Sequence, residues 1–291
     1  MTVLVLGGTR FFGIHMVKAL LENGHQVTIA TRGKANDPFG KQVERVILDR
    51  NSPDRIAETL GGKFFNVVCD NLAYCSNDVK YLLDHIGCER YIMTSSASVY
   101  TNQHLFTKES EFSALSYPLK WCNRQDYPYD EAKRQAECAL FQAYPHIRSV
   151  AVRLPYVIGG DDYTKRLYCY VDQIIKGDPI FVDNLNEEIG FIRSSEAGNF
   201  IAWLADQKFT GAINGGNTGT ISLQEIMDYV EQKVGKKAQY AADGLAMPYN
   251  GQRSFSLDVG YASTLGYRFT DLKEWIFMLL DCLIDTSYEQ R

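Results

Sequence analysis

Residues 2–13 read TVLVLGGTRFFG, an apolar run that ends in a glycine-rich turn. The run Thr2–Leu6 is typical of a buried strand, and the residues after the turn have the spacing of an amphipathic helix. In such a strand–turn–helix unit, backbone N–H groups and the positive end of the helix dipole can bind a pyrophosphate. The pattern therefore predicts a dinucleotide-binding site at this turn.

The turn differs from the usual Gly-x-x-Gly-x-x-Gly pattern because Arg10 stands at the middle glycine position. Glycines also serve tight turns and close helix packing, so a glycine-rich turn alone is weak evidence for a ligand. Its position directly after an apolar strand is what favours the dinucleotide interpretation.

The length and composition of the chain limit the classes of protein to which it can belong. A chain of 291 residues is long enough for one large α/β unit or two closely packed lobes. Its hydrophobic content of 45% is that of a folded globular protein. The net charge of −5 and the lack of a long Lys/Arg cluster argue against a dedicated nucleic-acid-binding protein. We expect a small-molecule substrate and no nucleic-acid partner.

The cysteines and histidines indicate neither disulfides nor a metal site. The seven cysteines are scattered without a Cys-x-x-Cys pair, a usage typical of a reducing compartment. No His-x-x-x-His pair occurs among the five histidines, so no metal is expected. The first residues lack the features of a signal peptide, and the longest apolar run, Trp275–Leu280, is too short to span a bilayer. We expect a cytoplasmic protein without a membrane partner.

The first half of the chain alternates strand-like and helix-like segments. Such alternation predicts an α/β fold with a doubly wound parallel sheet, whose ligands lie at the carboxyl ends of the strands. The helices are expected around 14–21 and at Pro53–Leu60, Asp78–Ile86 and Pro128–Gln142. The predicted strands are rich in Val and Ile: Thr2–Leu6, Gln26–Thr31, Val43–Leu48, Asn66–Asp70, Arg90–Thr94 and Arg148–Leu154.

The second half is less regular. Helices are expected at 160–176, Asn199–Asp206 and 222–234, and the last one begins at Asp271, with Trp275, Met278, Leu279 and Cys282 facing inward. We predict a dinucleotide-binding domain at 1–158 with part of 190–220, and a substrate-binding lobe at 159–190 and 221–291. The polar stretch Asn102–Tyr127 has no clear periodicity and is interpreted as a mobile flap.

Tyr129 and Lys133 are the first candidates for chemistry. They stand four residues apart after Pro128, a residue favoured in the first turn of a helix, so both side chains share one helical face. A lysine ammonium beside a phenol stabilises the phenolate and lowers the pKa of the tyrosine. Because the chain has 18 tyrosines, the pair taken alone favours a solvated tyrosine beside an exposed lysine.

A hydroxyl-rich segment follows the predicted fifth strand. Residues 94–100 read TSSASVY and begin at the carboxyl end of Arg90–Thr94, where this fold class binds its ligands. A hydroxyl at this place could bind a substrate carbonyl and share its proton with Tyr129, although Ser/Thr-rich turns are also common. The order of glycine turn, serine cluster and Tyr/Lys helix favours an active site.

These motifs, in this order, resemble the extended short-chain dehydrogenase/reductase family, also called the NAD-dependent epimerase/dehydratase family. The resemblance covers nearly the whole chain and implies a Rossmann-type sheet with a smaller C-terminal substrate lobe. It implies that Ser96, Tyr129 and Lys133 are catalytic. It also implies that the following residues contact the cofactor: Gly7, Thr9, Arg10, Phe11, Phe12, Gly13, Thr31, Arg32, Asp49, Arg50, Leu72, Ala73, Thr94, Tyr129, Lys133 and Pro155.

The segment after the second predicted strand bears on the choice of cofactor. NAD-specific folds have an acidic residue there, whereas this chain has Thr31 and Arg32, with Arg10 in the adjacent loop. Two guanidinium groups without a carboxylate favour a 2′-phosphate, so we expect NADP, with NAD as the alternative. Arg32 could equally be a solvated loop residue. In the family, Asp49 and Arg50 would flank the adenine, and a loop salt bridge is the alternative.

The resemblance implies hydride transfer between the cofactor and an alcohol or carbonyl carbon of a sugar-like or small carbonyl substrate. Tyr129 would exchange the proton, Lys133 would lower its pKa and hold the nicotinamide ribose, and Ser96 would position the oxygen. It also allows a homodimer formed through the Tyr/Lys helix. The chain has Tyr156 and Glu188 where UDP-sugar enzymes of the family commonly have Asn and Arg, which argues against a nucleotide sugar.

A second function stays open. The loop GGTRFFG and Thr31–Gly33 are similar to an atypical branch of the family, which includes epimerase-like bacterial proteins and RNA-binding proteins of plant chloroplasts. Several members of that branch lack catalytic residues, whereas this chain keeps all three. We therefore predict an NAD(P)-dependent oxidoreductase or epimerase, and the alternative is a catalytically silent cofactor-binding scaffold with a regulatory or RNA-associated role.

Overall fold

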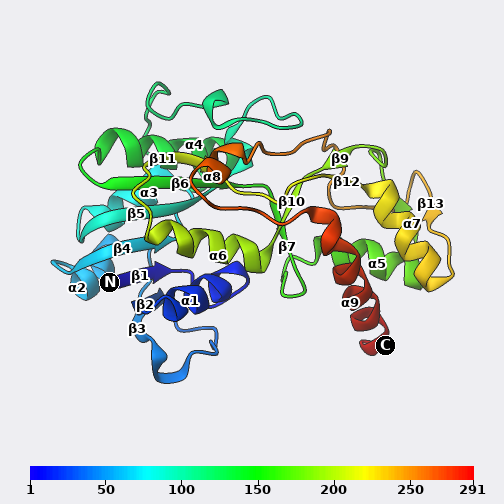
Figure 1. The fold of residues 1–291 in the computed structure, drawn as a ribbon, viewed down its shortest axis with the longest axis horizontal. Coiled ribbons are helices and arrows are strands. Elements are labelled where there is room, and N and C mark those ends of the chain that lie inside the picture. The colour runs from blue at the N-terminus through cyan, green and yellow to red at the C-terminus, as the bar shows by residue number, and fades with distance from the viewer. The chain divides into compact units, whose positions relative to one another are not determined.

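The structure, a computed structural model, describes residues 1–291, which group into two compact units. The first unit consists of Met1–Thr101, Lys108–Leu154 and Ser195–Gly215. The second consists of Asn102–Thr107, Pro155–Ser194 and Gly216–Arg291. Figure 1 labels the helices and strands of both.

The first unit is built on a seven-stranded sheet of order β11-β6-β5-β4-β1-β2-β3. All neighbouring strands pair in parallel, which confirms the predicted doubly wound sheet. The direction of winding reverses between β1 and β4, where this fold class binds ligands. The strands are β1 (Thr2–Leu6), β2 (Gln26–Thr31), β3 (Glu44–Ile47), β4 (Phe64–Asp70), β5 (Gly87–Ser96), β6 (Arg148–Leu154) and β11 (Gly211–Asn214).

Helices pack on this sheet as they do in Rossmann-type folds. Buried residues of α2, α3 and α4 share one core with strand residues such as Leu4, Leu6 and Val68. The helices α1 and α6 pack closely on each other, because a Cβ at Gly198 would lie 2.5 Å from the carbonyl oxygen of Phe12 (Figure 1). Their bounds are α1 (Phe12–Glu22), α2 (Pro53–Leu60), α3 (Ser76–Leu83), α4 (Tyr129–Cys138) and α6 (Ser194–Ala205), and a π-helical turn, η4 (Ala139–Ala143), continues α4.

Local sequence signals explain where these elements begin and end. The side chain of Ser52 accepts a hydrogen bond from the backbone of Arg55 and caps α2, whose first residue is a proline. Helix α1 ends at Glu22 with Asn23 as its C-cap, and Gly24 after the cap has a φ of +77°, which glycine adopts readily. The strand β11 was not predicted because it has only four residues and begins with a glycine.

The second unit contains three small sheets. The strand β7 (Tyr156–Ile158) pairs with β10 (Phe191–Arg193), so residues 155–158 group here rather than with the first unit. The strand β9 (Glu188–Ile189) pairs with β12 (Ile221–Ser222). A third sheet places β8 (Pro179–Phe181) between β13 (Gln239–Tyr240) and β14 (Leu245–Ala246).

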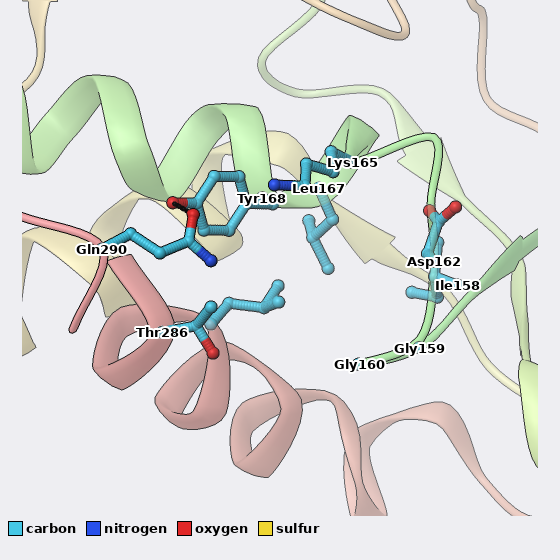
Figure 2. A pocket seen from close by; sticks show the side chains of 10 residues that line it. Ile158, Gly159, Gly160, Asp162, Lys165, Leu167, Tyr168, Thr286 and Gln290 are labelled. Carbon is cyan, nitrogen blue, oxygen red and sulfur yellow. Dashed lines mark hydrogen bonds between the residues drawn. The ribbon is translucent and has the colours of Figure 1, made fainter. Parts of the chain in front are cut away.

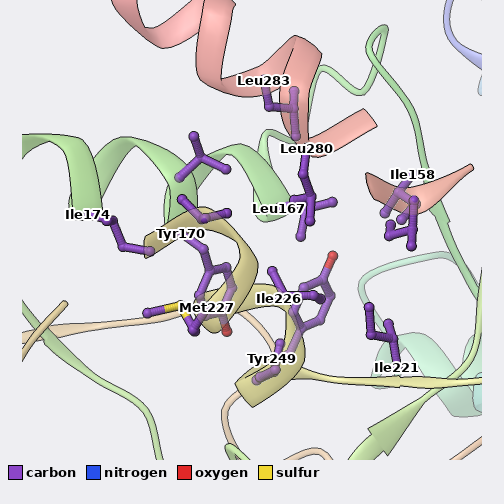
Figure 3. Packing of buried hydrophobic residues seen from close by; sticks show 14 of the residues in the cluster. Ile158, Leu167, Tyr170, Ile174, Ile221, Ile226, Met227, Tyr249, Leu280 and Leu283 are labelled. Carbon is purple, nitrogen blue, oxygen red and sulfur yellow. The ribbon is translucent and has the colours of Figure 1, made fainter. Parts of the chain in front are cut away.

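Three helices of this unit, α5 (Arg166–Lys176), α7 (Leu223–Val234) and α9 (Ile276–Glu289), share an apolar core, shown in Figure 3. A shorter helix, α8, spans Gly260–Thr264. Ser222 and Glu225 form a capping box at the start of α7. The segment before α5 forms turns rather than the predicted helix, because Gly159 and Gly160 precede it and Lys165 has a φ of +54°.

The prediction for the last helix was wrong in part. Trp275 is buried as expected, but Met278 is 59% exposed and Cys282 is exposed. A short 3-10 turn, Leu272–Glu274, comes first, and the α-helix begins only at Ile276. Its inward face therefore runs through Ile276, Leu280, Leu283 and Ile284, and Leu279 packs at the edge of this core. None of the helices in the structure has the length and apolarity needed to cross a bilayer.

Candidate active site

The turn between β1 and α1 depends on its glycines. Gly7 has a φ of +86°, which strains any other residue. A Cβ at Gly13 would lie 2.2 Å from the carbonyl oxygen of Gly7, and one at Gly8 would lie 2.8 Å from the Val17 side chain. Because these glycines have no Cβ, the first turn of α1 can lie directly against the end of β1.

The N-terminus of α1 suits an anion. No side chain caps the helix, and its first turn contains no acidic residue, so the positive end of the helix dipole is not neutralised. Phe11, at the cap position, has a φ of +52°, a conformation that costs a non-glycine residue about 1–3 kcal/mol. Arg10 is exposed and forms no hydrogen bond or ion pair with the protein. These features fit the pyrophosphate of a dinucleotide.

Asn71 connects this turn to the end of β5. It follows β4, and its side chain donates to the carbonyl oxygen of Gly7 at 3.3 Å. The hydroxyl of Thr94, at the end of β5, donates to the same side chain at 2.6 Å. The glycine turn and the hydroxyl-rich segment, which are far apart in the sequence, are thus neighbours at the switch point of the sheet.

Lys133 completes this set of contacts. Its ammonium donates to the carbonyl oxygens of Ala73 at 2.7 Å and of Thr94 at 2.8 Å. The residue is only 2% exposed, and burial lowers the pKa of its side chain to about 8. With this pKa the side chain is mostly charged at pH 7 and loses its proton around pH 8, well below the ordinary value for lysine.

Tyr129 is the first residue of α4 and is 50% exposed. The Lys133 nitrogen lies 6.0 Å from the centre of its ring. Ser96 ends β5 and is half-buried, and its hydroxyl accepts a hydrogen bond from the backbone of Ser98 at 3.1 Å. The three predicted catalytic residues therefore all belong to β5 and α4.

Sequence reasoning missed a buried polar network behind this site. Glu137, on α4, forms a salt bridge of 2.7 Å with Arg153, and the two side chains are 0% and 1% exposed. Glu137 also accepts a hydrogen bond from Ser95, the neighbour of Ser96. Arg153 in turn donates to the hydroxyl of Tyr100 at 3.1 Å. The network fixes α4 against β5 and β6. It could not be predicted from the sequence, because Glu137 and Arg153 belong to no recognisable motif.

Comparison with known proteins agrees with this geometry. The model of the NAD dependent epimerase/dehydratase family matches residues 3–74, which hold the glycine turn and Asn71. The predicted family resemblance is confirmed.

Two curated relatives from Arabidopsis thaliana extend the match. The chain is 27% identical over 203 residues to the chloroplast stem-loop binding protein of 41 kDa b, which covers 64% of this chain and 50% of that protein. This chain thus spans about half the length of that relative. It is 23% identical over 264 residues to UDP-glucuronic acid decarboxylase 3, which covers 80% of this chain and 75% of that protein.

The fold of the family recurs in solved structures. UDP-glucuronic acid 4-epimerase from Bacillus cereus, in complex with UDP-glucuronic acid and NAD, matches with a TM-score of 0.75 and 19% identity, and both chains are covered completely. UDP-glucose 4-epimerase from Thermus thermophilus, in complex with NAD, matches with a TM-score of 0.71 and 18% identity over 97% of this chain and 99% of that one. At these identities the likeness concerns the fold.

In Rossmann-type folds that bind NAD, an acidic residue that follows the glycine turn by about 20 positions binds the adenine ribose. The end of β2 carries no acid here. Thr31 is half-buried, and its hydroxyl accepts a hydrogen bond from the backbone of Gly33 at 3.1 Å. Arg32 is exposed and forms no hydrogen bond or ion pair with the protein. Asp49 is also exposed, and its carboxylate accepts from the backbone of Asn51.

Arg50 differs from the other expected cofactor residues. Its guanidinium is buried and donates to both carboxylate oxygens of Asp70, at 2.6 and 2.9 Å, and to the carbonyl oxygen of Asp78 at 2.7 Å. It thus makes the salt bridge that was the alternative to a cofactor contact, because Asp70 ends β4 next to it. We leave Arg50 out of the proposed cofactor contacts.

Three more of the residues expected at the cofactor lie at the glycine turn and directly after β4. Thr9 and Phe12 are half-buried at the glycine turn, and Leu72 is half-buried after β4, with its N–H bonded to the Asp70 carboxylate at 2.8 Å. Pro155 belongs to the second unit.

The stretch Asn102–Tyr127, expected to be a mobile flap, is tied down over much of its length. Arg153 donates to two of its backbone carbonyl oxygens, at 2.9 and 3.0 Å. Gln135 donates to a third carbonyl at 3.1 Å, and Ser76 accepts from a backbone N–H of the stretch at 2.7 Å.

Residues Ala132–Cys138 of α4 are buried within this one chain. A homodimer through α4 stays a prediction.

The second unit has a pocket of its own, of about 140 Å³. It lies between the start of α5 and the end of α9, with Tyr168 and Gln290 at one side and Gly159 and Gly160 at the other (Figure 2). None of the predicted catalytic or cofactor residues lines it. Met247 and Tyr249, from a loop near the C-terminus, are part of the apolar core of this unit.

Proposed function

We propose that this chain is an NAD(P)-dependent oxidoreductase or epimerase that acts at an alcohol or carbonyl carbon of a sugar-like or small carbonyl substrate. The observation that carries the proposal is the hydrogen-bonded path from Gly7 through Asn71 and Thr94 to Lys133. This path brings the anion-binding turn and the Tyr/Lys helix to the same edge of one sheet. Hydride transfer coupled to proton exchange requires this, because the cofactor and the proton-exchanging residue must meet at one substrate carbon.

When bound, the dinucleotide would supply the hydride acceptor or donor. Backbone N–H groups at the start of α1 would bind its pyrophosphate. We assign to Tyr129 the exchange of a proton with the substrate oxygen, since this tyrosine is half-exposed at the start of α4, one helical turn before Lys133. The Lys133 ammonium would stabilise the phenolate, and the Ser96 hydroxyl would orient the substrate oxygen.

For the cofactor we propose NADP over NAD. Arg10 and Arg32 are exposed cations without protein partners, and no carboxylate stands at the end of β2. A guanidinium binds a phosphate through two parallel hydrogen bonds, so this pair suits a 2′-phosphate. The two solved epimerases are described in complex with NAD, which keeps NAD as the alternative.

The relatives also suggest substrates to test. UDP-glucuronic acid decarboxylase 3 and the Bacillus cereus epimerase are named for a nucleotide sugar, so UDP-glucuronate and UDP-glucose are the first compounds to try. The deciding experiment measures binding of NADPH and NADH by nucleotide fluorescence, followed by turnover of these sugars and of small carbonyl compounds. Cofactor binding without turnover of any of them would leave the substrate class open, and failure to bind either cofactor would contradict the proposal.

The stem-loop binding protein supports a second candidate function, an RNA-associated scaffold. The net charge of −5 argues against it, because RNA binding relies on a basic surface. Salt-sensitive retention of a stem-loop RNA by a protein that binds no dinucleotide would favour this second candidate.

A further inference from the structure

Arg124 lies beside the proposed active site and has no role in the chemistry described above. It belongs to a tight turn in which the backbone N–H of Asn123 donates to the Asp126 carboxylate at 2.7 Å, and the backbone N–H of Asp126 donates back to the carbonyl oxygen of Asn123 at 3.1 Å. The Asn77 side chain, on α3, donates to the side chain of Asn123 at 2.9 Å. The turn is therefore fixed to the helix that follows β4.

The ring of Tyr74 orients the Arg124 side chain. The central guanidinium carbon lies 3.8 Å from the centre of this ring, a close cation–π contact. The Lys133 nitrogen lies 4.6 Å from the same centre, and the rings of Tyr74 and Tyr129 are 6.2 Å apart. One aromatic ring thus links Arg124 to both proposed catalytic residues of α4.

The guanidinium has no anionic partner in the protein. Arg124 is exposed, and it forms no hydrogen bond or ion pair. The acidic residues of the neighbouring elements are engaged elsewhere: Asp78 with the backbone of Tyr74, Asp126 within the turn, and Asp130 and Glu131 with Arg134. A guanidinium stacked through its face still presents the N–H groups of its edge, the geometry that binds a carboxylate or phosphate through two hydrogen bonds.

We infer that Arg124 determines substrate specificity by binding an oxyanion of the substrate, a carboxylate or a phosphate attached near the reacting carbon. The inference rests on the proposed function, because it places that anion next to the ring of Tyr74, whose centre lies 6.2 Å from that of the Tyr129 ring. A charge-assisted hydrogen-bonded pair of this kind favours the anionic ligand by about 10- to 100-fold over its neutral counterpart.

The test compares pairs of probes that differ by one anionic group, in the full-length protein saturated with its preferred dinucleotide. UDP-glucuronate against UDP-glucose reports on a carboxylate, and glucose 6-phosphate against glucose reports on a phosphate. Calorimetry should show tighter binding of the member with the added anionic group in at least one pair, and that pair identifies the group. Arg124→Gln should abolish this preference and leave the affinity of the member without that group within about twofold.

Two further variants sharpen the result. Arg124→Lys keeps the charge but not the two parallel donors, so it should retain only part of the preference. Arg55→Gln removes an exposed arginine of α2 and should change nothing. The inference is overturned if neither anionic probe is preferred, or if the preference survives in Arg124→Gln. The proposed function is tested separately by the affinity of the protein for NADPH and NADH. Arg124→Gln should not change these two affinities.

Discussion

The ammonium group of Lys133 lies 2.8 Å from the carbonyl oxygen of Thr94, and this contact ties α4 to the carboxyl end of β5. A second contact, to Ala73, ties the same group to the segment after β4. The lysine therefore holds α4 against β5 and against the segment after β4, in addition to its proposed catalytic role with Tyr129. Its nearest acceptors are neutral carbonyls rather than carboxylates, so burial dominates and lowers its pKa to about 8.

This lowered pKa makes the stability of the protein depend on pH. Below pH 8 the buried lysine is charged in both the folded and the unfolded protein, and folding carries the full desolvation cost. Between about 8 and 10.5 the folded protein releases the proton while the unfolded chain keeps it, so the free energy of unfolding rises with pH. Between pH 7 and pH 9.5 we expect Lys133 to add about 2 kcal/mol.

Urea unfolding of the wild type and of Lys133→Met at both pH values measures this gain. The variant cannot titrate at this position, so the difference between the two proteins isolates the lysine from all other groups. An equal pH dependence in both proteins would contradict the lowered pKa.

Tyr129→Phe should abolish turnover and leave the affinity for the dinucleotide within about twofold. The substitution removes only the hydroxyl, which is the proposed proton carrier, and the residue is exposed at the start of α4, so the fold should not change. Steady-state kinetics and a fluorescence titration of the same preparation check both parts. Tyr127→Phe, on the loop just before α4, is the matched control. Normal turnover by Tyr129→Phe would contradict the assignment of Tyr129 as the proton carrier.

Arg32→Ala should weaken NADPH binding by about 10- to 100-fold, the value of one charge-assisted contact, and leave NADH binding unchanged. The guanidinium has no protein partner to lose, so the effect should be confined to the 2′-phosphate. Nucleotide fluorescence gives both affinities. A wild-type preference for NADH would overturn the interpretation of Arg10 and Arg32.

The parts of this protein that could be predicted are those with a local signal. Strands β1, β2 and β6 and helix α2 have the expected bounds, because Val/Ile-rich runs and a Ser-Pro start are visible within a few residues. The glycines of the first turn were also predictable, since the close approach of Gly13 to Gly7 needs a residue without a side chain.

Other features depend on contacts between distant segments. Nothing local distinguishes Arg50, bound to Asp70, from Arg32, which is free in solvent, and both were expected at the cofactor. The same holds for Arg124, whose relation to Tyr74 arises only once the loop before α4 packs on α3. In these cases the fold, and not the residue type, decides whether a cation is available to a ligand.

Gly13→Ala tests the first turn. A methyl group at this position would lie 2.2 Å from the backbone oxygen of Gly7, which cannot move without shifting the end of β1. We expect a loss of about 1–3 kcal/mol in the free energy of unfolding and at least a tenfold loss of dinucleotide affinity. Gly160→Ala, where a Cβ meets nothing within 4 Å, is the control. Unimpaired binding by Gly13→Ala would mean that the turn does not hold the cofactor.

Glu137→Gln tests the buried network behind the site. The substitution keeps the shape of the side chain but leaves the Arg153 guanidinium, which is 1% exposed, without its carboxylate. Removing one member of a buried ion pair costs about 3–5 kcal/mol, so urea unfolding should show a loss of this size. Glu89→Gln breaks the exposed pair with Arg148 and should cost less than about 1 kcal/mol.

Glu137→Gln should also affect activity, because Ser95 bonds to Glu137 and the adjacent Ser96 ends the same strand. We expect this variant to lower kcat more than it weakens dinucleotide binding. Equal effects of the two substitutions on stability would show that the network does not hold α4 against the sheet.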